Sequence, residues 1–131
     1  MVDISEVYQS GDWAKEKHVP AIDAPASAKK GEQITVTVSI GKGIAHPNTT
    51  EHHISWIELY FLPKGEKFAI QLAKADFCAH GASAAGPNMS TVYTAPSAVF
   101  SFKTDKPGTL MASSYCNIHG LWKNSAELEI A

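Results

Sequence analysis

The segment QITVTVSI, residues 33–40, alternates apolar and polar side chains without a break. Isoleucine and valine take the even positions, and threonine and serine take the odd positions that follow Gln33. Successive side chains of a β-strand point to opposite faces of the sheet, so this pattern predicts a strand with one buried and one exposed face. Such a strand needs a second layer of structure to cover its apolar face.

Further segments have the β-branched and aromatic composition of strands, namely 54–62, 68–77, 98–104, 109–116 and 125–130. The turn sequence PKG (63–65) separates the first two, and DKPG (105–108) separates the third from the fourth. We therefore expect each of these pairs to form a hairpin. No stretch shows a sustained helical period with caps. The chain is predicted to be all-β, an antiparallel β-sandwich of six or seven short strands.

The composition is that of a soluble globular protein, and it argues against several classes of partner. The 131 residues fit one domain, 1–131, with a short N-terminal arm. A net charge of −2 gives no electrostatic reason to expect binding to nucleic acid or to an anionic membrane. The N-terminus lacks the basic and then apolar pattern of a signal peptide, so we expect a cytoplasmic protein. In that compartment Cys78 and Cys116 are expected to be free thiols.

The positions of the histidines suggest a functional site. The chain has six: His18, His46, His52, His53, His80 and His119. Four of them lie in predicted connections, where rigid scaffolds commonly carry function. His52 and His53 are adjacent at the start of a strand, so only one of the two can easily face a shared site. We expect His80 to be an exposed loop residue and Cys78 to be a small buried hydrophobe.

The clearest metal-binding pattern is in SYCNIHGLW, residues 114–122, where Cys116 and His119 are three residues apart. A thiolate and an imidazole at this spacing in a turn can reach one ion. A blue-copper site would add His46 and usually a methionine soon after the histidine, but no methionine follows His119. A site that also includes His18 and His52 would have five ligands and one open octahedral position, which suits iron. The spacing leaves both metals open.

Taken together and in order, the motifs resemble superoxide reductase of the one-iron type, also called neelaredoxin, of the desulfoferrodoxin/neelaredoxin family. The resemblance runs from about Gly11 to Trp122. The motifs that carry it are GDWAKEKHVP (11–20), HPNTTEHHI (46–54), IELYFLP (57–63), AHG (79–81), GPN (86–88), VYT (92–94) and SYCNIHGLW.

The resemblance implies an immunoglobulin-like sandwich of about seven strands and one mononuclear non-haem iron, Fe2+/Fe3+. It implies that the equatorial ligands are His18, His46, His52 and His119. It further implies Cys116 as the axial ligand, Glu16 as the sixth ligand of the oxidised metal, Lys17 beside the open position and His53 as a non-ligand.

The function implied is the one-electron reduction of superoxide to hydrogen peroxide, with Glu16 and Lys17 as catalytic residues. Rubredoxin or a similar small carrier would re-reduce the iron, and family analogy favours a homotetramer. The alternative is a blue-copper-like electron carrier that uses His46, Cys116 and His119.

Overall fold

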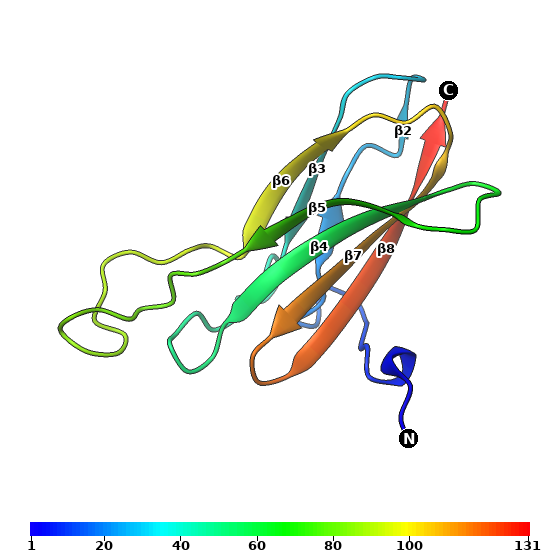
Figure 1. Cartoon of the computed structure of the whole chain (residues 1–131). Coiled ribbons are helices and arrows are strands. Elements are labelled where there is room, and N and C mark those ends of the chain that lie inside the picture. The colour runs from blue at the N-terminus through cyan, green and yellow to red at the C-terminus, as the bar shows by residue number, and fades with distance from the viewer.

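A computed structural model describes residues 1–131, and it consists of two β-sheets packed face to face (Figure 1). One sheet has the strand order β1-β3-β6, and the other has the order β2-β8-β7-β4-β5. The all-β sandwich prediction is confirmed. The elements are η1 (Ile4–Glu6), β1 (Ala21–Asp23), β2 (Ser27–Ala28), β3 (Ile34–Ser39), β4 (Ile54–Pro63), β5 (Ile70–Asp76), β6 (Ser97–Phe102), β7 (Gly108–Cys116) and β8 (Gly120–Ile130).

The core lies between the two sheets and follows from the alternation of the strands. On β3, Val36 and Val38 are fully buried, whereas the threonines between the apolar residues face outward. The second sheet supplies Leu59 from β4, Leu110 from β7 and Leu128 from β8 to the same cluster. Full burial of one such side chain contributes about 1.5–3 kcal/mol. This layer fixes the register of the strands and hence the positions of the loops that join them.

Two expected pairings differ in outcome. The hairpin of β4 and β5 is confirmed, with Phe61 opposite Ile70. The expected hairpin between 98–104 and 109–116 is wrong, because β6 pairs with β3 and β7 lies between β4 and β8. The turn sequence marks a change of direction, but here it carries the chain from one sheet to the other. Val36 pairs with Phe100, which buries the aromatic face of β6 against the core from the smaller sheet.

The remaining differences lie at the edges and at the last strand. The short strand β2 runs parallel to β8, so the sandwich is not entirely antiparallel. β8 begins at Gly120 rather than at residue 125, directly after the turn that follows β7. No helix is long and apolar enough to cross a membrane.

The connections that carry the predicted ligands meet at one end of the sandwich. Figure 1 shows the β3–β4 connection, which carries His46 and His52, and the β7–β8 turn, which carries His119, at this end, together with the ligand-free β5–β6 connection. The C-terminus and the β4–β5 turn lie at the opposite end.

Candidate metal centre

The β7–β8 hairpin presents Cys116 and His119. Cys116 is the last residue of β7, and Gly120 begins β8 with a φ of 82°, a left-handed conformation that glycine adopts without strain. The backbone N–H of His119 donates a hydrogen bond to Cys116 Sγ across 3.3 Å. The hairpin therefore holds the thiol and the imidazole on the same side of the turn. Cys116 Sγ is fully buried with the core.

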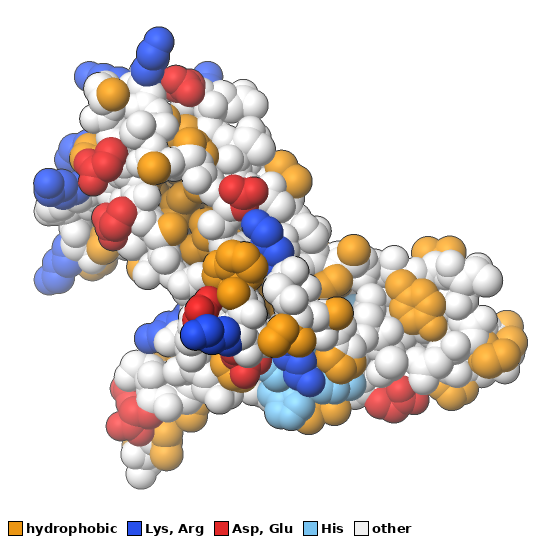
Figure 2. Space-filling model, turned by 180° about the vertical axis from the view of Figure 1, so that it is seen from behind, with side chains coloured by type: hydrophobic (Ala, Val, Ile, Leu, Met, Phe, Trp, Pro, Cys, Tyr) orange, Lys and Arg blue, Asp and Glu red, His pale blue; other side chains and the backbone are white.

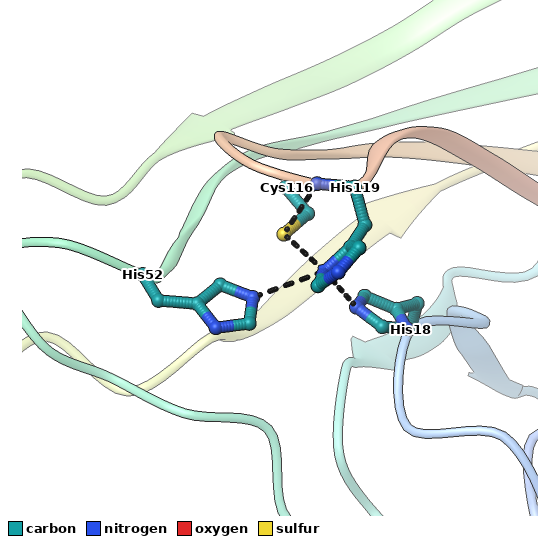
Figure 3. A group of neighbouring side chains, drawn as sticks. All are labelled: His18, His52, Cys116 and His119. Carbon is teal, nitrogen blue, oxygen red and sulfur yellow. Dashed lines mark hydrogen bonds between the residues drawn. The ribbon is translucent and has the colours of Figure 1, made fainter.

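Two further histidines converge on this turn from other connections. His119 Nδ1 lies 3.1 Å from His18 Nε2 and 3.2 Å from His52 Nε2. It lies 3.8 Å from Cys116 Sγ, and Figure 3 shows the three rings and the sulfur pointing toward one another. The potential ligand atoms of these four residues all lie within 4.8 Å of one another. The structure therefore brings together residues that lie up to a hundred positions apart in sequence.

His46 is the fifth member of the group. Its Nε2 lies 3.6 Å from Cys116 Sγ, and its ring centroid is 4.8 Å from that of His18 and 4.7 Å from that of His52. Five of the six residues named as ligands by the sequence resemblance therefore lie in one cluster, and Glu16 lies outside it. In each of the four histidines, one ring nitrogen faces the centre of the cluster. This nitrogen is Nε2 in His18, His46 and His52, and Nδ1 in His119.

The hydrogen bonds behind the rings fix the protonation of two of them. His18 Nδ1 lies 2.6 Å from Glu16 Oε1, and His46 Nδ1 lies 2.6 Å from the carbonyl oxygen of Pro47. Each Nδ1–H donates to its oxygen, so each Nε2 presents a lone pair to the centre. Lone pairs placed so close together repel one another unless a cation or a proton lies between them. The donor set therefore fits a transition metal ion.

Trp122 is a residue whose role at the site was missed from the sequence, although it ends the quoted motif. Its ring stacks on His18 with centroids 4.7 Å apart and an interplanar angle of 11°. Its Nε1–H donates to the carbonyl oxygen of His119, which also accepts a hydrogen bond from the Gln9 side chain. Trp122 therefore limits the rotation of one ring and anchors the backbone of another.

Glu16 and Lys17 lie at the edge of the cluster. Glu16 Oε1 accepts hydrogen bonds from the ring and the backbone N–H of His18, so in this conformation the carboxylate is directed to the outer side of that ring. Burial favours a higher pKa for Glu16, but the bonds from His18 and the charge of Lys17 hold the pKa below its usual value. Lys17 is half-buried, and Figure 2 shows lysine side chains beside the histidines.

The segment that carries Glu16 and Lys17 packs closely against the β3–β4 connection. A Cβ at Gly43 would lie 2.9 Å from Cα of Ala14 and 3.1 Å from the carbonyl oxygen of Trp13. Lys42 Nζ also lies 5.1 Å from the centre of the Trp13 ring. The turn before His18 therefore packs against the β3–β4 connection, which also carries His46.

The electrostatics of the metal-free cluster disfavour protonation. Burial, followed by the nearby His18 and His52 rings and Lys17, lowers the pKa of His46 to about 4. Burial and the neighbouring His119, His18 and Lys17 also lower the pKa of His52. At neutral pH these imidazoles are therefore neutral and ready to bind a metal ion.

These pKa values predict how the metal-free protein responds to acid. A histidine of the unfolded chain titrates near 6.5, so between pH 6.5 and about 4 the unfolded state binds more protons at His46 than the folded state. Stability is then full above pH 6.5 and falls as the pH drops toward 4. Urea unfolding of metal-depleted protein at pH 7.5, 6 and 5 is expected to show a falling midpoint. His46→Gln should weaken this slope, and a midpoint that is constant or rises toward pH 5 would contradict the assignment.

Two other expectations are corrected. Both cysteines are free, as expected, but Cys78 is exposed rather than buried, because it follows β5 outside the core. His80 is not an exposed loop residue, since it is half-buried and its ring stacks on His53. His53 faces away from the metal cluster while His52 faces into it, as the alternation of an extended chain predicts.

Comparison with known proteins places this centre in a family. The sequence model of the desulfoferrodoxin family matches residues 10–125, a range that contains every residue of the cluster. The chain belongs to the desulfoferrodoxin family. Within it, the chain is 58% identical over 126 residues to the superoxide reductase of Pyrococcus furiosus, covering 96% of this chain and 99% of that protein.

Two other members of the desulfoferrodoxin family extend the comparison. Neelaredoxin from Megalodesulfovibrio gigas is 52% identical over 92% of both chains. The structure of the reduced superoxide reductase (neelaredoxin) of Archaeoglobus fulgidus superposes with a TM-score of 0.88 at 56% identity, covering 95% of this chain and 99% of that one. The similarity therefore spans the sandwich as well as the motifs.

Proposed function

We propose that the chain is a superoxide reductase that converts superoxide to hydrogen peroxide at one mononuclear non-haem iron. The observation that carries the proposal is the convergence of four imidazoles and one thiolate at the loop end of the sandwich. The relatives named as superoxide reductases, at up to 58% identity over nearly the whole chain, support it. Each turnover consumes one superoxide, one electron and two protons and releases one hydrogen peroxide.

The donor set favours iron over copper. A copper electron carrier needs only His46, Cys116 and His119 with a weak axial ligand, and it leaves His18 and His52 without a role. Here His18 Nε2 and His52 Nε2 lie as close to His119 Nδ1 as a shared ion requires. Five ligands suit an octahedral ion with one exchangeable position. When bound, iron would supply a one-electron couple, and Cys116 would hold it as a thiolate that tunes its potential.

Lys17 is proposed to attract and orient the substrate. The Lys17 ammonium is a nearby positive charge that opposes protonation of His46 and His52. Superoxide is an anion, so a cation beside the site raises its local concentration and its association rate. We assign Lys17 the further role of holding the water that supplies the protons for peroxide release.

Glu16 is proposed to move between two partners. In the conformation described it accepts two hydrogen bonds from His18, and it lies next to Lys17 in sequence. A carboxylate released from His18 would lie at the edge of the cluster and would be free to bind the oxidised ion. In the reduced protein, the hydrogen bonds to His18 would keep the Glu16 carboxylate away from the metal.

Replacing Glu16 by alanine is expected to change the absorption spectrum of the oxidised protein and to leave the rate of superoxide reduction largely intact. The substitution removes the sixth ligand of the oxidised ion but none of the five that hold it. Spectra of the ferric protein and pulse-radiolysis rates check this, with Glu6→Ala as a control on an exposed residue of η1. An unaltered ferric spectrum would show that the carboxylate does not bind at rest.

The function itself is tested by metal content and turnover. Protein from cells grown with ample iron is expected to contain one iron per chain and to consume superoxide with a reductant, without releasing dioxygen. Copper in place of iron, with no superoxide-dependent turnover, would favour the electron carrier. Failure of metal-depleted protein to take up Fe2+ would remove the enzyme proposal.

The donor, assembly and compartment are also proposals. We propose rubredoxin or a similar small redox protein as donor. A homotetramer is supported by the apolar arm, in which Val2, Ile4 and Val7 are exposed with no buried residue in η1. The cytoplasm is supported by the two free cysteines, which are typical of reducing compartments. Residues 1–131 are proposed to act as one iron-binding domain.

A further inference from the structure

The proposed function leaves three of the sequence motifs without a role. AHG (79–81), GPN (86–88) and VYT (92–94) all lie in the β5–β6 connection, residues 77–96, which Figure 1 shows as the longest loop at the site end. None of their residues is a metal ligand in the cluster. The structure shows that each motif takes part in contacts within this loop or with the β3–β4 connection.

Two of the motifs close the base of the loop. Thr94 donates its backbone N–H to the carbonyl oxygen of Ala79 at 2.8 Å, and Ala79 N–H donates to Thr94 Oγ1 at 3.1 Å. His80 and Tyr93 form an antiparallel bridge beside them. A Cβ at Gly81 would lie 2.9 Å from both the Tyr93 hydroxyl and Asn88 Oδ1, so a glycine is needed where these side chains approach. The loop is thus a closed unit rather than a loose connection.

The first contact with the ligand-bearing connection is a stack of two histidines. The rings of His53 and His80 lie with centroids 3.6 Å apart and an interplanar angle of 4°. His80 Nε2 lies 2.6 Å from the carbonyl oxygen of Phe77, and His53 Nδ1 lies 2.9 Å from that of Thr49. His53 is therefore held on the side opposite the metal cluster. His52 precedes it in the chain and points to the other side, into the cluster, so the contacts that hold His53 also limit the orientation of His52.

Asn48 connects the same histidine to the region next to His46. Its Nδ2 donates to the carbonyl oxygen of Thr94 at 3.0 Å, which fixes the amide so that Oδ1 faces His80 Nδ1 at 3.1 Å. Asn48 lies two residues after His46, so its hydrogen bond to Thr94 holds the backbone that leads from one ligand to the next.

The second contact is made by Asn88 of the GPN motif. Asn88 Oδ1 accepts from Thr50 N–H at 2.8 Å, and Nδ2 donates to both carboxylate oxygens of Glu51 at 2.9 and 3.1 Å. Asn88 has a φ of 61°, a left-handed conformation that asparagine tolerates better than most residues. From the metal turn, Asn117 donates to the carbonyl oxygen of Glu51 and accepts from His53 N–H. The residues just before His52 are therefore tied both to the loop and to the hairpin.

We propose that the β5–β6 connection is a positioning element of the metal centre. Through His80 and Asn88 it holds the β3–β4 connection so that His46 and His52 reach the same ion as Cys116 and His119. His80 and Asn88 are positioning residues, since they touch no ligand atom and act through His53, Asn48 and Glu51. The inference rests on the proposed metal site but not on the identity of the substrate.

The test measures how fast the full chain, loaded anaerobically with Fe2+, loses the ion to an excess of chelator. His80→Ala and Asn88→Gly are expected to lose iron about 10-fold faster than the unmodified protein, the lower range for residues that orient ligands. Asn88→Gly keeps the left-handed backbone and removes only the side-chain contacts. Met89→Ala, an exposed neighbour in the same loop, is the matched control and should match the unmodified rate.

Further variants separate positioning from a general loss of stability. His80→Phe keeps a flat ring against His53 but loses the ring nitrogens that face Phe77 and Asn48, so it should recover only the part of the metal retention that depends on the stack. The urea midpoints of metal-free Met89→Ala and metal-free Asn88→Gly should change by similar amounts. The rate of iron loss, in contrast, should rise in Asn88→Gly and stay unchanged in Met89→Ala. Iron loss from both His80→Ala and Asn88→Gly at the unmodified rate would overturn the proposal. Failure of the unmodified chain to bind Fe2+ would instead count against the proposed function.

Discussion

Replacing Cys116 by serine is expected to abolish the thiolate-to-metal absorption band and to lower superoxide turnover by more than about 100-fold, beyond the usual effect of altering a residue behind the ligands. Cys116 Sγ is the one sulfur in the cluster, 3.6 Å from His46 Nε2 and 3.8 Å from His119 Nδ1. A thiol ionises when it binds a metal ion, whereas a serine hydroxyl remains protonated and neutral at pH 7. The variant would therefore lack the negative charge and the electron donation that the thiolate would supply to the bound ion.

The experiment compares Cys116→Ser with Cys78→Ser, which changes the exposed thiol and should behave like the unmodified protein. Absorption spectra, iron content and superoxide kinetics are measured on each protein. Because Cys116 is fully buried, urea unfolding is measured as well to show that the serine variant is folded. A folded Cys116→Ser protein that kept the absorption band would exclude this sulfur as the ligand.

Much of the fold was predictable because the strands alternate cleanly. The predicted segments 33–40, 54–62 and 109–116 agree with β3, β4 and β7 to within a residue or two at each end. On β3 the apolar positions are the buried positions of the core, as the two-residue period of a strand predicts. The partner of each strand was harder to predict. A turn sequence such as DKPG reverses the chain, but whether the chain stays in its sheet depends on which face must be covered.

The candidate site was predictable in its residues but not in its geometry. Cys116 and His119 are three residues apart, a spacing that allows a shared ion but does not by itself predict one. His18 approaches His119 across about a hundred residues, and only the packing of the two sheets brings them together. His80 shows the limit clearly, because its partner His53 lies in another connection and no local pattern joins them. The resemblance to a family supplied the ligand set that spacing left open.

Replacing Lys17 by alanine is expected to slow the second-order reaction with superoxide by about 10-fold or more at low ionic strength, within the range of electrostatic effects on association. Lys17 is half-buried, and its charge lowers the pKa of His46 and His52, so it acts electrostatically on the cluster itself. The rate should also depend less on salt, because screening removes little when the cation is gone. Pulse radiolysis at several salt concentrations measures both quantities.

Two variants isolate the charge of Lys17 from its position. Lys17→Arg keeps the positive charge and should retain most of the association rate, although the larger planar group does not reproduce the compact ammonium. Lys15→Ala removes an exposed cation two residues away and serves as the matched control, because both substitutions change the net charge equally. If Lys15→Ala slowed the reaction as much as Lys17→Ala, the effect would come from the overall charge of the protein. A Lys17→Ala rate equal to the unmodified rate at low salt would remove this residue from substrate capture, and the neutral imidazoles and the ion would have to attract superoxide without it.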